Sequence, residues 1–306
     1  MTPVLKNLQF LNDRADEGSY HGYGIQNFLE LDPRFASGGD ADAELHALVD
    51  QAHARGMYII FDIVLNHAGD VFAYASGSEA VHSETPQKIN WRDERGRPRA
   101  DWTEGSDIVA PPADATVFPD ELRRNIFFRR QGRAAAGGPE TVGDFSSLKQ
   151  MLTENYALGN ILIRDFQYLI AKYDLDGFRI DTLKYIHPEF ALRFGNAIRE
   201  FALSVGKKNF FTFGEVYDDE QKISEFIGRN TTVAGDLVGG HRMDAITDEH
   251  VHEPDVVGIS EHAVGHATAH DVVATCEVTP HERTGHEGPA QLLEHDGRVG
   301  QPPELG

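Results

Sequence analysis

Apolar positions along residues 40–228 alternate between helical spacing and short continuous runs. Residues 40–55 have helical spacing, and residues 57–65 are apolar at odd and even positions alike. A run of the second kind is typical of a parallel strand that is covered on both faces. The buried face of the expected helix carries Leu45, Leu48, Val49 and Ala52. A helix followed at once by a buried strand predicts an α/β unit.

The same alternation returns after residue 143. Helices are predicted over 160–173 and 188–205 and again from 218, and strands over 177–181 and 209–216. Pro188 suits the first turn of its helix, where the hydrogen missing from its nitrogen costs little. Helices and strands that alternate in this way predict a parallel α/β sheet.

Residues 68–143 lack this periodicity. They combine glycine, proline and charged residues with both tryptophans and a few short apolar patches. Because a structureless loop of this length is uncommon inside a domain, we predict an inserted subdomain of irregular structure with a few short strands.

The composition changes sharply at about residue 240. Residues 241–306 contain thirteen acidic residues and nine of the fifteen histidines, but no lysine, phenylalanine, tyrosine or tryptophan. Their only strand-like fragments are 256–259 and 272–273. We therefore expect a poorly ordered tail, of the kind that an out-of-frame gene end would produce. A metal-binding tail is the alternative, on the histidines His250, His252, His262, His266 and His270.

The overall charge narrows the range of partners. Net charge is −21, which argues against nucleic acid and anionic membranes. Cys276 is the single cysteine, and no apolar run approaches the roughly 18 residues that a membrane span requires. The first residues lack the pattern of a signal peptide, although the start looks clipped, so the sequence leaves the compartment open.

Polar side chains stand at the carboxyl ends of the predicted strands. Asp62 interrupts the first strand, and Arg179 and Asp181 end the second. Glu215 ends the third, 34 residues after Asp181, so the two belong to adjacent strands. Active sites of parallel α/β folds lie at this edge.

Two carboxyl groups on adjacent strand ends suit glycoside cleavage. A separation of about 5–5.5 Å allows one carboxylate to act as nucleophile and the other as acid and base. Arg179 shares a strand face with Asp181 and is expected to hold the pKa of that carboxyl down. Phe213 and Val216 are expected to desolvate Glu215 and raise its pKa. The structural alternative is an ordinary ion pair between Arg179 and Asp181.

Three segments resemble the signature motifs of the α-amylase family, glycoside hydrolase family 13. Residues 62–67 (DIVLNH) match the first, 177–184 (GFRIDTLK) the second and 213–216 (FGEV) the third. The resemblance covers about 1–240 and implies a partial (β/α)8 TIM barrel with an inserted irregular domain B.

The resemblance also implies roles for individual residues. Asp181 corresponds to the nucleophile and Glu215 to the general acid/base, and Arg179 orients the nucleophile. His67 hydrogen-bonds the sugar in the cleaved subsite, and Tyr23 stacks under that sugar. A satisfied histidine at a strand end and a tyrosine in a loop core are the structural alternatives.

Three further residues correspond to positions in the family's motifs. Asn66 would be a ligand of calcium where the family has this metal, or else a backbone cap. Asp62 braces the Arg179 region within the substrate-binding site. Lys184 is either a substrate contact or a surface residue at a helix start. The family often has histidine after this lysine, whereas this chain has Tyr185, which weakens the expectation of calcium.

The resemblance divides the chain into four parts. Residues 1–67 hold the end of barrel strand 2 to strand 3, 68–143 domain B, 144–240 strands 4–5, and 241–306 the tail. An incomplete barrel of this kind is expected to leave both edges of its sheet open. The family's third catalytic carboxylate should follow an Asn-His pair after residue 240, but 241–306 contain no asparagine.

The expected function is that of a retaining hydrolase of the α-amylase type. It would cleave α-glucosidic bonds of starch-like glucans or malto-oligosaccharides. Two alternatives stay open. One is an α-glucan transferase with the same catalytic pair, and the other is a catalytically dead fragment that lacks the third carboxylate.

Overall fold

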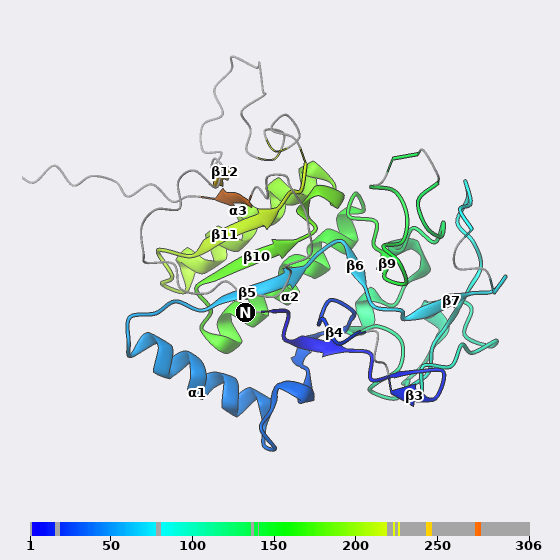
Figure 1. Ribbon diagram of the computed structural model, residues 1–306, viewed down its shortest axis with the longest axis horizontal. Coiled ribbons are helices and arrows are strands. Elements are labelled where there is room, and N and C mark those ends of the chain that lie inside the picture. The colour runs from blue at the N-terminus through cyan, green and yellow to red at the C-terminus, as the bar shows by residue number, and fades with distance from the viewer. Residues whose placement is uncertain are drawn as a thin grey trace, which may run out of the picture.

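Three parallel strands form the centre of the protein (Figure 1). The computed structural model describes residues 2–15, 19–77, 81–135, 138–139, 141–218, 223 and 226, and the backbone of 243–246 and 273–276. The central strands are β5 (Ile60–Val64), β10 (Gly177–Asp181) and β11 (Phe211–Glu215). β10 lies between the other two and is parallel to both, as the alternation of helices and strands predicts.

The two faces of this sheet differ in burial. Phe61, Phe178 and Ile180 are buried on one face, whereas Asp62 and Arg179 on the other are only partly buried. The second face of β5 is still largely covered, as expected, since Val64 on that face is fully buried and the Asp62 side chain is only 11% exposed. No closed barrel forms among the described residues. The second face carries the polar side chains of Asp62, Arg179 and Asp181 next to apolar ones such as Val64 and Phe213.

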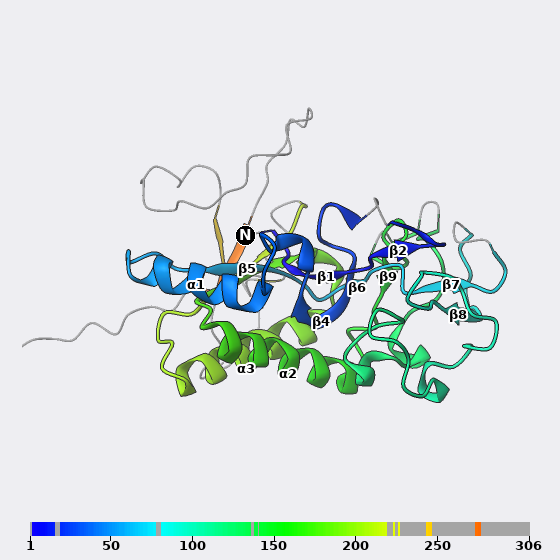
Figure 2. The same ribbon diagram turned by 90° about the horizontal axis from the view of Figure 1, so that it is seen from below.

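Helices α2 (Tyr156–Tyr173) and α3 (Pro188–Ser204) run side by side along the buried face (Figure 2). α2 begins four residues before the predicted start, because the Asn155 side chain accepts hydrogen bonds from the backbone N–H groups of Ala157 and Leu158. Phe166 and Phe194 pack edge-on against each other and Phe166 against Phe178 of β10. α3 begins at Pro188 as predicted and ends at Ser204, one residue before the predicted end.

Helix α1 (Ala41–His53) precedes β5 and confirms the helix predicted there. Leu45, Val49 and Ala52 are buried, but Leu48 is 45% exposed. At 3.6 residues per turn Leu48 lies about 60° from Leu45 and on the far side from Val49, so it falls at the margin of the buried stripe.

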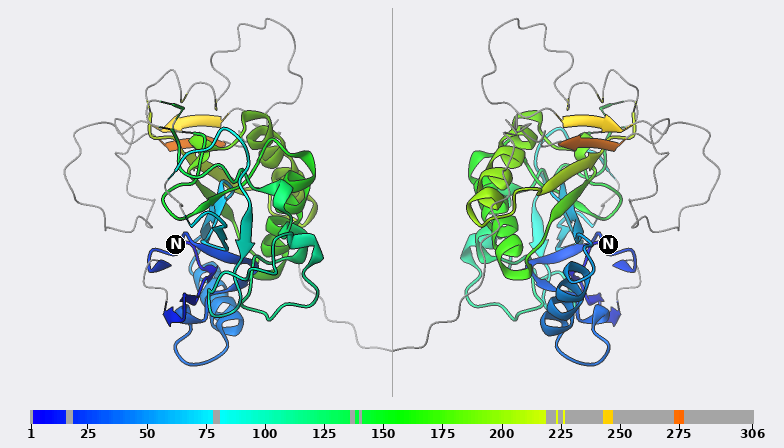
Figure 3. Two further views of the ribbon diagram at one scale, coloured as in Figure 1. Left: turned by 90° about the vertical axis from the view of Figure 1, so that its right-hand side faces the viewer. Right: turned by 90° about the vertical axis from the view of Figure 1, so that its left-hand side faces the viewer.

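The edge of the sheet beyond β11 is paired. β13 (Val273–Cys276) runs antiparallel to β11, and β12 (Met243–Ile246) runs antiparallel to β13 (Figure 3). The expectation of an open edge is thus wrong on this side. β13 overlaps the predicted fragment 272–273. The fragment 256–259 and the five tail histidines lie outside the described residues, as does most of the helix expected from residue 218, although Ile223 and Phe226 are helical and buried.

Short strands and turns make up the rest of the described chain. β1 (Leu5–Asn7) pairs with β4 (Ile25–Leu31), β2 (Phe10–Leu11) with β3 (Arg14–Ala15), β6 (His67–Ala68) with β9 (Lys149–Gln150), and β7 (Phe72–Tyr74) with β8 (Ile89–Trp91). Short 3-10 helices span Pro33–Phe35, Gly105–Asp107, Asp120–Leu122, Asn125–Phe127 and Leu183–Tyr185. Phe72, Trp91 and Phe128 pack edge-on into an aromatic cluster.

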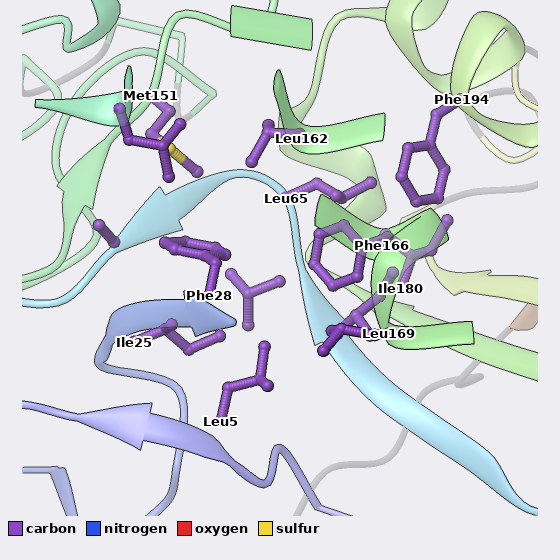
Figure 4. Close-up of a cluster of buried hydrophobic side chains, with 14 of the residues drawn as sticks. Leu5, Ile25, Phe28, Leu65, Met151, Leu162, Phe166, Leu169, Ile180 and Phe194 are labelled. Carbon is purple, nitrogen blue, oxygen red and sulfur yellow. The ribbon is translucent and has the colours of Figure 1, made fainter. Parts of the chain in front are cut away.

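One apolar core joins these parts (Figure 4). Leu5 and Phe28 from the β1–β4 pair, Leu65 after β5, and Leu162 and Phe166 from α2 are all buried in it. The segment that follows β5 therefore shares its apolar core with helix α2. In the described part of the chain, every helix is too short or too polar to cross a membrane.

Candidate active site

The guanidinium group of Arg179 joins the three strand ends. Its Nη1 donates to Asp62 Oδ1 at 2.9 Å and to Asp181 Oδ1 at 2.9 Å. Its Nη2 lies 3.0 Å from Glu215 Oε2. One arginine from β10 therefore contacts a carboxylate from each of the three parallel strands.

The register of the strands explains why these groups meet. Arg179 lies beside Asp62 of β5 and Phe213 of β11, and Ile180 lies beside Gly214. Asp181 and Glu215 follow one residue later, at the same level of adjacent strands. Side chains alternate between faces along a strand, so both carboxyl groups share the face of Arg179.

The pKa of Asp181 is raised to about 7. Burial is the largest cause, since this residue is only 7% exposed, and the neighbouring carboxylates Glu215 and Asp62 add to it. Arg179 opposes these effects but does not outweigh them. The expectation that Arg179 holds this pKa down is therefore wrong in its net direction, because burial of Asp181, helped by the two neighbouring carboxylates, outweighs the guanidinium.

Glu215 is more open than the sequence suggests. Val216 is buried as expected, but the Glu215 side chain is 43% exposed. Its carboxylate pairs with Arg179 and stays open to solvent, so the burial expected from Phe213 and Val216 is not observed.

Thr182 is a residue of this site that the motifs did not single out. Its backbone N–H donates to Glu215 Oε2 at 3.3 Å. Its φ of 53° is left-handed, which is rare for a β-branched residue and is typical of functional sites when it occurs. No sequence signal indicates this conformation.

Tyr23 contacts the site residue of β5, Asp62. Its hydroxyl donates to Asp62 Oδ2 at 3.0 Å, and its ring stacks on His21 with centroids 5.6 Å apart. Burial raises the pKa of Tyr23, and the Asp62 carboxylate raises it further, so the hydroxyl keeps its proton. Asp62 thus receives hydrogen bonds from both Tyr23 and Arg179.

His67 follows β5 in the chain and is buried. Burial lowers its pKa to about 3, which the backbone of Tyr23 only partly opposes. The imidazole is therefore neutral near pH 7, and a neutral ring offers one donor and one acceptor.

Asn66 supplies one oxygen of the kind that calcium uses. Its Oδ1 is buried and has no hydrogen-bond partner among the described residues, while its Nδ2 lies 3.3 Å from His67 Nδ1. Calcium takes about six to eight oxygen ligands. In the described ranges, three or more His, Cys, Asp or Glu side chains nowhere gather as a metal site. Among the described residues, Asn66 therefore has no cluster of three or more such side chains beside it to complete a calcium site.

Lys184 is buried, so the surface alternative for this residue is wrong. Its Nζ donates to the Tyr217 carbonyl at 3.2 Å and pairs with Asp218 at 3.1 Å. It thereby ties the segment after β10 to the segment after β11.

A groove of about 550 Å³ lies elsewhere, between the start of α2 and the turns at 120–127. Its lining includes Glu121, Arg124, Asn160 and Arg164. None of the strand-end residues contributes to it, so it is separate from the site around Arg179.

The chain is similar to known alpha-amylases. The family model described as "Alpha amylase, catalytic domain" matches residues 1–238. An alpha-amylase of Streptomyces lividans is 30% identical over 264 residues, which cover 81% of this chain and 27% of that protein. The periplasmic alpha-amylase of Escherichia coli is 25% identical and is matched over 55% of this chain and 29% of its own length.

The chain spans only about a third or less of these two relatives. A solved alpha-amylase of Geobacillus thermoleovorans, in complex with acarbose, is 23% identical with a TM-score of 0.45, over 74% of this chain and 38% of that one. The family model matches more than half of this chain and includes all three signature segments. The chain belongs to the α-amylase family of glycosidases.

Proposed function

We propose that this chain is a retaining glycoside hydrolase that cleaves α-glucosidic bonds of starch-like glucans. Asp181 is the nucleophile and Glu215 the general acid and base. The observation that carries the proposal is the Arg179 guanidinium, which contacts both carboxylates at 2.9 and 3.0 Å.

The spacing of the strands supports retention. Adjacent strands lie about 4.7–4.9 Å apart, and Asp181 and Glu215 stand at the same level of two of them. A separation of about 5–5.5 Å between their carboxyl groups, as a double displacement requires, is consistent with this arrangement. The nucleophile then reaches the anomeric carbon directly, with no water molecule between this carboxylate and the sugar in the first step.

The reaction follows from the charges of the site. Asp181 attacks the anomeric carbon while Glu215 protonates the leaving oxygen, so the glycosidic bond breaks and a glycosyl ester forms. Water then attacks the ester, and Glu215 takes up its proton as Asp181 leaves. A protonated Glu215 no longer repels the Asp181 carboxylate, which favours ionisation of the nucleophile.

Arg179 and Asp62 position the nucleophile. Tyr23, His67 and Lys184 are proposed to bind the substrate beside it. Asp62 accepts hydrogen bonds from Tyr23 and Arg179, so its own role is to brace the arginine. His67 is neutral, so it adds no charge to the site.

Activity on soluble starch and on an activated aryl maltoside tests the proposal. Proton NMR should show the α-anomer as the first product. Glu215→Gln should lower turnover of starch by roughly 10²–10⁴-fold and turnover of the aryl maltoside less, because a good leaving group needs little protonation. Asp101→Asn removes an exposed carboxylate and serves as the control.

Three results would count against the proposal. They are a β-anomer as first product, wild-type rates in Asp181→Asn, and no turnover of either substrate by the wild-type chain. Transfer products at high oligosaccharide concentration would instead indicate the transferase that shares this catalytic pair.

A further inference from the structure

The groove beside the start of α2 combines an apolar lining with two positive charges. Its apolar lining includes Phe127, Ile161 and Ile163, which are at most 8% exposed. Its polar lining includes the exposed residues Arg124 and Arg164. At about 550 Å³ the groove has the size of a small-molecule site.

The side chains of these two arginines have no polar partner in the part of the protein that the structure describes. Neither makes a hydrogen bond or an ion pair there, although Arg124 lies over the Phe127 ring, 6.0 Å from its centroid. The neighbouring Arg123 differs, because it pairs with Asp120 at 2.7 Å and donates to two backbone carbonyl groups. The fold thus uses Arg123 for its own structure and leaves the donors of Arg124 and Arg164 to a ligand.

The charge of the groove is opposite in sign to that of the whole chain. Its lining contains two guanidinium groups and one carboxylate, that of Glu121, which leaves a net charge of +1, whereas the chain carries −21. Asp165 follows Arg164 on α2, and burial, with a smaller effect of Glu121, raises its pKa to about 7. Below this pH Asp165 is mostly protonated and does not neutralise Arg164. A positive groove on an acidic protein favours an anion.

The two kinds of lining restrict the class of anion. A guanidinium group binds a carboxylate through two parallel hydrogen bonds. The apolar lining favours a ligand with an apolar body, because contact between the two removes both surfaces from water. An inorganic anion would leave the apolar lining uncovered, and a neutral sugar would leave both guanidinium groups unpaired.

We infer that this groove binds an organic carboxylate with an apolar body. Arg124 and Arg164 hold the carboxylate, and Phe127, Ile161 and Ile163 contact the body. The site is separate from the strand-end carboxylates and goes beyond the proposed glycosidase function. Its ligand contacts both the inserted segment 68–143 and helix α2, so binding stabilises the folded protein.

Isothermal titration of the full chain with 2-naphthoate at pH 6 tests this inference. Two matched compounds separate the two parts of the site: 2-naphthamide keeps the rings without the charge, and acetate keeps the charge without the rings. We expect saturable binding of 2-naphthoate and about 10-fold or more weaker binding of each matched compound. The melting temperature should rise with 2-naphthoate concentration.

Variants of the lining identify the place of binding. Arg124→Gln and Arg164→Gln should each weaken 2-naphthoate binding by roughly 3- to 10-fold, and Glu121→Gln should strengthen it by removing the opposing charge. The matched control is Arg14→Gln, because Arg14 is an exposed arginine of β3 outside the lining. It should leave binding unchanged, and melting temperatures of the free variants check that each is folded.

Four results would overturn the inference. They are no saturable binding of 2-naphthoate up to about 10 mM, equal affinity for 2-naphthamide or acetate, unchanged affinity in both Arg124→Gln and Arg164→Gln, and an equal loss in Arg14→Gln. Because none of these measurements involves turnover of a glucan, failure of the glycosidase proposal leaves their outcome unaffected.

Discussion

Replacing the candidate nucleophile should stabilise the protein, and by more at alkaline than at acidic pH. Asp181 is buried beside two other carboxylates, and its pKa of about 7 lies well above the value of 3.8 expected in an unfolded chain. Asparagine has nearly the same shape and carries no charge. Arg179 keeps its contacts with Asp62 and Glu215 in this variant.

The sign of the effect follows from proton binding. Between pH 3.8 and about 7 the folded protein holds a proton on Asp181 that the unfolded chain has lost. The free energy of unfolding of the wild type therefore falls as the pH rises through this window, and it levels off above the folded pKa.

The size of this change in the free energy of unfolding depends on how much of the pH range below the folded pKa the experiment covers. One pH unit corresponds to about 1.4 kcal/mol. Two such units separate pH 5 from the folded pKa of about 7, which amounts to about 3 kcal/mol. The amide in Asp181→Asn does not titrate, so the advantage of this variant over the wild type should be larger at pH 8 than at pH 5 by about this amount.

Urea unfolding at pH 5 and pH 8 measures this difference directly. Asp50→Asn, at an exposed position of α1, makes the same charge change and should give a nearly pH-independent effect. The expectation is refuted if Asp181→Asn changes the free energy of unfolding equally at both pH values, or if it destabilises the protein more at pH 8.

The same geometry leads to predictions on rate and on packing. The kcat/KM for maltoheptaose should fall as the pH increases through about 7, because the Asp181–Glu215 pair then loses the proton that Glu215 must donate to the leaving oxygen; a flat profile from pH 5 to 8 would contradict this. Arg179→Lys should lower kcat by roughly 10²-fold, because an ammonium cannot hold carboxylates on two separate nitrogens; an unchanged kcat would rule this role out. Gly214→Ala should lower the free energy of unfolding by about 1–3 kcal/mol, because the added methyl group would collide with the Leu183 side chain. Gly39→Ala, which meets only the flexible tip of Glu44, is its control, and equal stability of the two variants would refute the packing argument.

The placement of the strand-end residues was predictable from sequence. Period-2 alternation puts Arg179 and Asp181 on one face of β10, and a single β/α repeat puts Glu215 on the next strand. Local pattern decides both facts. The helix that precedes β5 was predictable for the same reason, because its apolar spacing and its Asp40 cap are local.

The electrostatic balance of the site was not predictable. Arg179 is two residues from Asp181 in sequence, so its effect on that pKa is easy to anticipate. Burial of Asp181 depends on segments far away in sequence that exclude water, and it outweighs the arginine. Glu215 stays open for the converse reason, since nothing in its own strand determines what covers it.

Backbone conformations outside helices and strands were also not predictable from the sequence. Threonine favours extended structure, yet Thr182 is left-handed in the turn that follows β10. Phe145 belongs to a turn whose position depends on Asp144 and its buried partners. Tertiary contacts determine the backbone conformation at such positions, whereas the intrinsic preference of the residue favours a different one.

Trapping of the glycosyl–enzyme ester would identify the nucleophile itself. The wild-type chain is treated with 5-fluoro-α-glucosyl fluoride, digested and analysed by mass spectrometry. We expect one fluoroglucosyl group on the peptide that contains Asp181, formed with loss of fluoride and absent from Asp181→Asn. A label on another residue, or turnover of starch with no label on Asp181, would contradict the assignment of Asp181 as the nucleophile.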